Sequence, residues 1–161
     1  MTNILVSTDF SKSAERVAQC TAELAQLAGA RLILFHVYRA DAPTNEEHEE
    51  DTNSERYVQT MLDQLARKLQ KRTGVSVTRL MKPATDANDA IDIAKLIKAD
   101  FAIVCAQHLP KSAHTSVTFY DGLPVVSVPS LYPVNAAAFK QQLTSQFNSL
   151  GWSSAALAEV V

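Results

Sequence analysis

The chain has 161 residues, of which 47% are hydrophobic and 20% are charged, and its formal net charge at pH 7 is −2. These values are ordinary for a soluble globular protein, and they give no basis for expecting nucleic acid or an anionic membrane as the main partner. No apolar run approaches the roughly 20 residues that a membrane-spanning helix needs. The two cysteines lie far apart and no signal-peptide pattern is visible, which favours a reducing, cytoplasmic location.

The first predicted elements are a strand, a helix and a second strand. Residues 4–6 form a short apolar run, typical of a strand buried on both faces of a parallel sheet. Ser11 can cap the helix that follows, apolar residues then recur at helical spacing, and Gly29 can supply a left-handed end. A second apolar run, residues 32–37, completes this β–α–β unit.

Asp9 and Val37 lie at the carboxyl ends of these two strands. Parallel α/β sheets bind their ligands at that edge, so we predict that both residues face a ligand. The alternative for Asp9 is a turn-forming residue that caps the helix, a role that Asp takes readily. His36, beside Val37, is predicted to be a core histidine.

The middle of the chain predicts an exposed loop, a helix and an edge strand. Residues 39–53 are acidic and almost free of apolar side chains, which is typical of a solvated loop. A second helix is predicted from near Asn53, where capping-box spacing occurs, to Gly74. Residues 75–81 then alternate apolar and polar side chains, as in a half-buried strand near the edge of a sheet.

Two further buried strands are predicted at residues 101–105 and 123–128, after a third helix that Asp86 can cap. The alternation of strands and helices predicts an α/β fold with parallel strands and right-handed crossovers. The link between the last two strands, residues 106–122, is short for a crossover. We expect it to contain at most two turns of helix, between residues 112 and 120.

The tail predicts one more helix. Four large apolar residues recur at helical spacing beyond the last strand, at Phe139, Leu143, Phe147 and Leu150. We therefore divide the chain into an α/β domain, residues 1–130, and a helical extension, residues 131–161. Such an amphipathic helix needs an apolar surface to cover, and we hypothesise that it covers the surface left bare by the shortened crossover, either in the same chain or in its partner.

Residues 3–129 resemble the universal stress protein family. The resemblance rests on ILVSTDFS, on the helix SAERVAQCTAELAQLAGA, on the strand end FHV, and on ADFAIV and LPVVSVP. It implies a Rossmann-like open parallel sheet of five strands, ordered 3-2-1-4-5, with helices on both faces. It also implies a small cytoplasmic protein, often a dimer through the last strand, and linked to survival under stress. Many members bind ATP or AMP without being efficient enzymes.

Members that bind ATP carry the pattern G-x2-G-x9-G-[ST] from the end of the fourth strand. In the corresponding places this chain has Cys105, His108, Thr115 and then Ser116 and Val117, and the spacer is shortened from nine residues to six. Glycines there let backbone N–H groups surround phosphate oxygens, and side chains crowd that space. The resemblance therefore implies weak or absent triphosphate binding.

The adenosine-facing half of the site is partly retained. Asp9 matches the acidic residue after the first strand, and Val37 matches the residue whose backbone commonly contacts adenine. The resemblance thus implies Asp9, Val37, Ser116 and Val117 as the nucleotide-contacting residues, if any nucleotide binds.

Three functions follow as hypotheses. The first is a non-catalytic stress protein without a cofactor, which acts through protein interaction and forms a homodimer by pairing residues 125–128 across a twofold axis. The second is a sensor that binds ATP or AMP. The third is a small thiol- or metal-dependent enzyme centred on Cys105 and His108, with His114 and either Asp9 or His36 as further zinc ligands.

Overall fold

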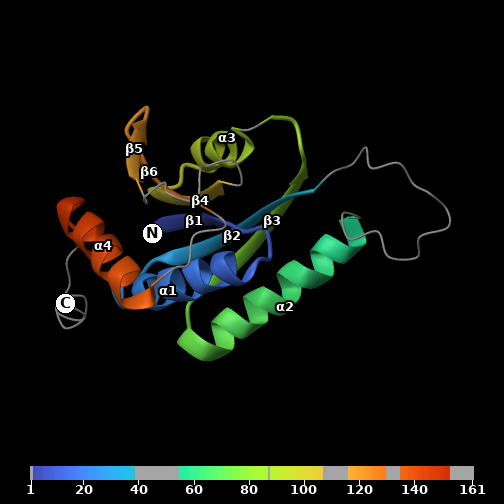
Figure 1. Ribbon diagram of the computed structural model, residues 1–161, viewed down its shortest axis with the longest axis horizontal. Coiled ribbons are helices and arrows are strands. Elements are labelled where there is room, and N and C mark those ends of the chain that lie inside the picture. Colours follow the sequence, from blue (N-terminus) through green and yellow to red (C-terminus); the bar gives the residue numbers. More distant parts are fainter. Residues whose placement is uncertain (1, 39–54, 87, 107–115, 130–134, 153–161) are drawn as a thin grey trace.

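The computed structural model describes residues 2–38, 55–86, 88–106, 116–129 and 135–152 (Figure 1). Its elements in chain order are β1 (Asn3–Ser7), α1 (Lys12–Ala28), β2 (Arg31–Tyr38), α2 (Glu55–Thr73), β3 (Val77–Pro83), α3 (Asp89–Leu96), β4 (Phe101–Ala106), β5 (Ser116–Tyr120), β6 (Leu123–Pro129) and α4 (Ala136–Ser149). They form an α/β fold around a six-stranded sheet ordered β3-β2-β1-β4-β6-β5.

The first β–α–β unit forms as its sequence predicts. The Ser11 hydroxyl accepts a hydrogen bond from the Ala14 N–H at 3.1 Å and so caps α1. Gly29 ends the helix with a φ of 68°, in the left-handed region. β1 then pairs in parallel with β2 on one side and with β4 on the other. This central position explains why Leu5 and its neighbours are fully buried.

Two layers of helices cover the sheet. In Figure 1, α1, α2 and α4 lie on one side of the strands and α3 lies on the other. Side chains alternate between the two sides, so Val6 packs in the core beneath α1 whereas Leu5 packs in the core beneath α3. The predicted helices on both faces are therefore confirmed.

Within the described residues the sheet contains six strands, whereas the sequence predicts five. The expected helical turns between residues 112 and 120 are wrong for the described part, because Ser116–Tyr120 is the strand β5, antiparallel to β6. Asp121 and Gly122 have φ angles of 51° and 84°, and two left-handed residues in succession form the tight turn of a β-hairpin. Residues 112–115 lie outside the described residues.

The hairpin also changes which strand forms the edge of the sheet. The expectation that residues 125–128 have an exposed edge is wrong, because β6 pairs with β4 on one side and with β5 on the other. A dimer formed directly through β6 would have to displace β5. The two outermost strands are β3, as predicted for the segment after Gly74, and β5.

The tail helix packs within its own chain. Phe139, Leu143 and Phe147 are buried, and the Phe147 ring meets the Phe101 ring edge-on, with their centroids 5.3 Å apart. Trp152 contacts both rings. This cluster lies on the α1 side of β4 and β6.

That position corrects the hypothesis about what the helix covers. A right-handed crossover from β4 to β6 would continue in the direction of the β3–α3–β4 crossover, and its helix would lie on the α3 side. The tail helix α4 lies on the opposite side, against α1. It therefore covers a surface that the shortened crossover would not have covered.

We predict that Phe147→Ala lowers the free energy of unfolding by about 3–5 kcal/mol, because it leaves a cavity between α4 and the sheet. The exposed residue Gln141 lies on the same helix, and Gln141→Ala should change stability by less than about 0.5 kcal/mol. Urea unfolding followed by circular dichroism measures both. Equal stabilities of the two variants would contradict the packing of α4 described above.

Candidate functional site

A tight turn follows β1 at the carboxyl edge of the sheet. The Thr8 N–H donates to the Phe35 carbonyl at 2.9 Å, and the Thr8 hydroxyl accepts from the Phe10 N–H at 3.0 Å. An Asp9 carboxylate oxygen accepts from the Ser11 N–H at 2.9 Å. Asp9 therefore takes the turn-forming role considered above, while it stays half-buried at the predicted ligand-binding edge.

Phe10 adopts an unusual backbone conformation in this turn. Its φ is 63°, a left-handed value that is rare for an aromatic residue. Its ring packs against the His36 ring, with the centroids 4.5 Å apart. The contact between the two rings ties the end of β2 to the turn after β1.

His36 is held as a neutral ring with a defined tautomer. Its Nδ1 lies 2.6 Å from the Thr8 carbonyl oxygen, which can only accept, so Nδ1 carries the proton. Burial lowers the pKa of His36, and this effect outweighs the Thr8 hydrogen bond and the Asp9 charge, which both act to raise it. Nε2 therefore has a lone pair at neutral pH.

Val37 lies near the carboxyl end of β2, two residues beyond Phe35, which is the last residue of β2 that pairs with β1. The Phe35 carbonyl faces β1, since it accepts from Thr8. Backbone polar groups of a strand alternate in direction, so those of Val37 face the same side, beyond the last residue of β1. Asp9 and Val37 thus lie beyond the paired parts of neighbouring strands at the same edge of the sheet, and the backbone donor and acceptor of Val37 are directed to the β1 side.

Cys105 lies near the end of β4, close to the same turn. Its N–H donates to the Ser7 hydroxyl at 3.0 Å. Burial, with a smaller effect of the Asp9 charge, raises the pKa of the Cys105 thiol to about 12. A thiol with that pKa is protonated at neutral pH and is therefore a poor nucleophile.

The remaining ligands of the hypothetical zinc site cannot be placed. His108 and His114 lie outside the described residues. Among the residues that the structure describes, no group of three or more His, Cys, Asp or Glu side chains is arranged to hold a metal ion.

Ser116 and Val117 lie far from the Asp9 turn. They begin β5 and pair with Ser127 and Val126 of β6. Three strand spacings separate β5 from β1, which is about 14 Å across the sheet. The four residues implied as nucleotide contacts therefore divide into a pair beside the β1 turn and a pair on the edge strand.

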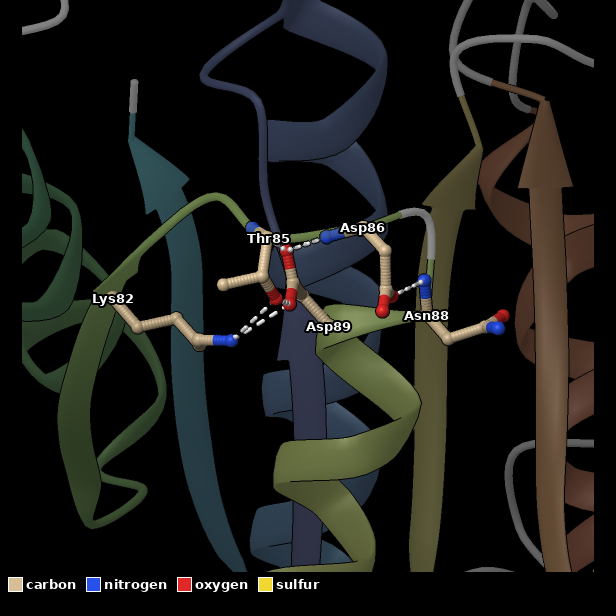
Figure 2. Close-up of polar contacts among 5 residues, drawn as sticks. All are labelled: Lys82, Thr85, Asp86, Asn88 and Asp89. Atoms are coloured by element: carbon tan, nitrogen blue, oxygen red, sulfur yellow. Dashed lines mark hydrogen bonds and ion pairs between the residues drawn. The ribbon is translucent and has the colours of Figure 1, made fainter. Parts of the chain in front are cut away.

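A second polar cluster lies at the carboxyl end of β3, and sequence reasoning missed it (Figure 2). The Asp89 side chain is only 3% exposed. It accepts hydrogen bonds from the Lys82 ammonium at 2.6 Å, from the N–H groups of Thr85 at 2.8 Å and Asp86 at 3.2 Å, and from the Thr85 hydroxyl. The cluster fixes the connection between β3 and α3.

Asp89 is ionised in this cluster. Burial alone would raise the pKa of its carboxyl group, but the Lys82 ammonium and the Thr85 and Asp86 donors outweigh burial and hold the pKa well below its usual range. The predicted cap residue, Asp86, instead accepts from the Asn88 N–H at 2.7 Å, and α3 begins at Asp89. The spacing Asp86-x-x-Asp89 is that of a capping box, the signal that would have indicated the reach of Asp89 back to Asp86.

A small cavity lies between α1 and α2. Its volume is about 190 Å³, and it is lined by Phe10, Glu15, Met61, Gln64, Leu65 and Lys68. Glu15 and Lys68 form an ion pair beside it. The cavity is smaller than the roughly 300 Å³ at which ligand pockets usually begin, and it shares only Phe10 with the β1 turn.

We predict that Asp89→Asn lowers the free energy of unfolding by about 2–3 kcal/mol near neutral pH, because the neutral amide loses the charge-assisted bonds of the cluster. Because the folded-state pKa of Asp89 is lowered, its stabilisation is complete above the ordinary value of about 4 and is lost as the pH falls further. The difference in the free energy of unfolding between the wild type and the variant should therefore become smaller in acid. Asp92→Asn, at an exposed position on α3, is the control, and a pH-independent difference would contradict the assignment.

The His36 environment predicts a second pH dependence. Its folded-state pKa lies below the ordinary value of about 6.5, so the unfolded chain binds more protons and the protein loses stability as the pH falls below that value. His36→Asn keeps a donor for the Thr8 carbonyl. It should reduce the slope of the unfolding free energy against pH between about pH 7 and pH 5, which urea titrations measure. An unchanged slope would show that the ring does not titrate as described.

None of the helices in the described segments has the length and apolar character needed to cross a bilayer. No curated protein matches the chain significantly. The fold, in contrast, has many counterparts among solved structures.

Three of these structures illustrate the likeness. A universal stress protein from Burkholderia pseudomallei has 22% identity and a TM-score of 0.55, with 80% of this chain and 96% of that chain covered. One from Arabidopsis thaliana with AMP bound has 19% identity and a TM-score of 0.55, with 85% and 99% covered. One from Archaeoglobus fulgidus in complex with dAMP has 20% identity and a TM-score of 0.50, with 65% and 80% covered.

At these identities the structural likeness concerns the fold. The sequence itself provides the assignment, because the model of the universal stress protein family matches residues 1–114, well over half of the chain. These residues include β1, the Asp9 turn, the Lys82–Asp89 cluster and β4. The chain belongs to the universal stress protein family.

Proposed function

We propose that this chain is a non-catalytic protein of the stress response that acts by associating with protein and does not bind ATP tightly. The observation that carries the proposal is the position of Ser116. In the family pattern for ATP binding, this residue directly follows the last glycine of the loop whose backbone N–H groups surround phosphate oxygens. Here it begins a strand on the far edge of the sheet.

The hydrogen-bonding pattern of β5 supports this proposal. A two-residue turn joins Tyr120 to Leu123, and such hairpins close with a hydrogen-bonded pair. Hydrogen-bonded pairs then alternate along the hairpin, which makes Ser116 and Ser127 another such pair. The Ser116 N–H is thus directed to β6 and not to a phosphate.

Cys105, at the described end of β4, gives further support to the proposal. The Cys105 N–H is taken by the Ser7 hydroxyl. The thiol itself, with its pKa raised to about 12, is not available as a thiolate for nucleophilic attack. Both features support a protein without thiol-dependent catalysis.

A second candidate is a sensor that binds adenosine or AMP without using triphosphate contacts. It is favoured by the Val37 backbone groups, which face the space next to Asp9. The Arabidopsis and Archaeoglobus structures hold AMP and dAMP, which makes adenine mononucleotides the ligand class to test.

Thermal unfolding with ligands separates these candidates. Under the leading proposal, saturating ATP leaves the melting temperature unchanged relative to tripolyphosphate, because only a ligand bound to the native state stabilises it. Under the second candidate, AMP and adenosine raise the melting temperature, and Asp9→Asn abolishes the shift whereas Asp92→Asn preserves it.

Two results would contradict the leading proposal. One is a large shift with ATP or its hydrolysis by the purified protein. The other is a stoichiometric metal ion in the purified protein, which would favour the metal-dependent alternative.

A further inference from the structure

The two edges of the sheet differ in how they are protected against pairing with another strand. The β3 edge carries Arg79 and Lys82 and ends at Pro83, and charged side chains and proline are the usual means of preventing edge-to-edge association. The β5 edge reads Ser-Val-Thr-Phe-Tyr, without a charge or a proline. Of the two edges, only β5 lacks protection.

Large apolar side chains are exposed at this same edge. Phe119 is 62% exposed, and Tyr120 on the same strand is 36% exposed. The Lys95 ammonium donates to the Asp121 carboxylate at 2.7 Å and thereby ties α3 to the hairpin turn. The edge strand is therefore held in place, and little ordering is required before it can pair with a partner.

The register of the hairpin identifies the backbone groups that point outward. Tyr120 and Thr118 form hydrogen-bonded pairs with β6, so the N–H and carbonyl groups of Val117 and Phe119 point away from the sheet. The proline at position 124 is consistent with this pattern, because it faces Phe119 and has no N–H to donate. No strand of the described segments pairs with this outer side.

We infer that β5 pairs antiparallel with β5 of a second copy of this chain, about a twofold axis at Thr118. This inference rests on the proposed function, for which it names the partner. In this register Val117 lies opposite the second copy's Phe119, and Phe119 lies opposite its Val117. Both are hydrogen-bonded pairs that use the four outward-pointing backbone groups of each strand.

The strand is self-complementary in this register. The aromatic Phe119 meets a β-branched residue, a favourable cross-strand pair, and Thr118 meets its own copy in a non-hydrogen-bonded pair. No like charges face each other, because β5 carries none. A second copy therefore provides partners for the outward-pointing backbone groups of β5 without any additional element. For this reason we choose it over an unrelated peptide.

The resulting dimer differs from the one that the family resemblance implies. Pairing through the last strand is blocked here, since β5 already occupies that edge of β6. The sheet of the dimer would continue from one β5 to the other, with the twofold axis one strand further from the Asp9 turn.

A charge at the twofold axis tests the inference. Thr118 is exposed, and Thr118→Lys places two like charges directly opposite each other, which should raise the dimer dissociation constant about tenfold or more. Thr118→Asp should weaken the dimer in the same way, and an equimolar mixture of the two variants should restore it as a heterodimer. Thr78→Lys, at an exposed position on the opposite edge strand, is the matched control. Analytical ultracentrifugation of the full chain measures the dimer dissociation constant of the wild type, of the three variants and of the mixture.

A cysteine at the same position tests the register without destabilising the dimer. The Cα atoms of a non-hydrogen-bonded antiparallel pair lie about 4.5 Å apart, within the range that a disulfide spans. Thr118→Cys should therefore form a covalent dimer on mild oxidation, whereas Thr78→Cys should remain monomeric on a non-reducing gel. The native Cys20 is buried and the pKa values of Cys20 and Cys105 are raised, so neither should contribute.

The outcomes separate this inference from the function on which it rests. A wild-type chain that stays monomeric, or a dimer that Thr118→Lys leaves intact and Thr118→Cys does not cross-link, overturns β5 pairing. Neither result bears on ATP binding, which the ligand screen decides. A dimer that Thr118→Lys weakens and the oppositely charged mixture restores supports the inference, even if AMP also binds.

Discussion

The central strands of this protein carry apolar side chains on both faces, and the rest of the structure depends on covering both. Leu5 and Val6 are adjacent in β1, yet they are buried in different cores, one beneath α3 and one beneath α1. The helices that follow β1 and β2 cover the α1 side of β1, β2 and β3. The α1 side of β4 and β6 is covered by the tail helix, through Phe139, Leu143 and Phe147.

The strand β5 has two consequences for the sheet. It forms a hairpin with β6 through the Asp121–Gly122 turn and makes β6 an interior strand. It also directs the backbone of Ser116 along a β-ladder at the edge of the sheet, three strand spacings from β1. The same strand carries no charge and no proline, so this edge lacks the usual protection against pairing with another strand.

Polar and ring contacts hold the described chain at the carboxyl ends of β1, β2 and β3. Thr8 fixes the tautomer of His36, Phe10 adopts a left-handed conformation to pack on that ring, and Asp9 closes the turn. At the next strand, Asp89 gathers Lys82 and the start of α3 into a buried ionic cluster. These contacts have structural roles that do not require a ligand.

The sequence by itself determined the elements whose apolar patterns and caps are local. Ser11 and Gly29 mark the ends of α1, alternation marks β3 as an edge strand, and the i, i+4 spacing of Phe139 and Leu143 marks the tail helix. Because Asp9 directly follows a buried strand, the strand-end rule was enough to locate it. Only the tertiary structure decided the rest, since strand pairing, helix placement and the partners of Asp89 depend on contacts between residues that are distant in the chain or face one another across a turn. A five-residue segment such as Ser116–Tyr120 is compatible with a helical turn or a strand, and its pairing with Leu123–Pro129 selects the strand because that pairing satisfies its backbone hydrogen bonds.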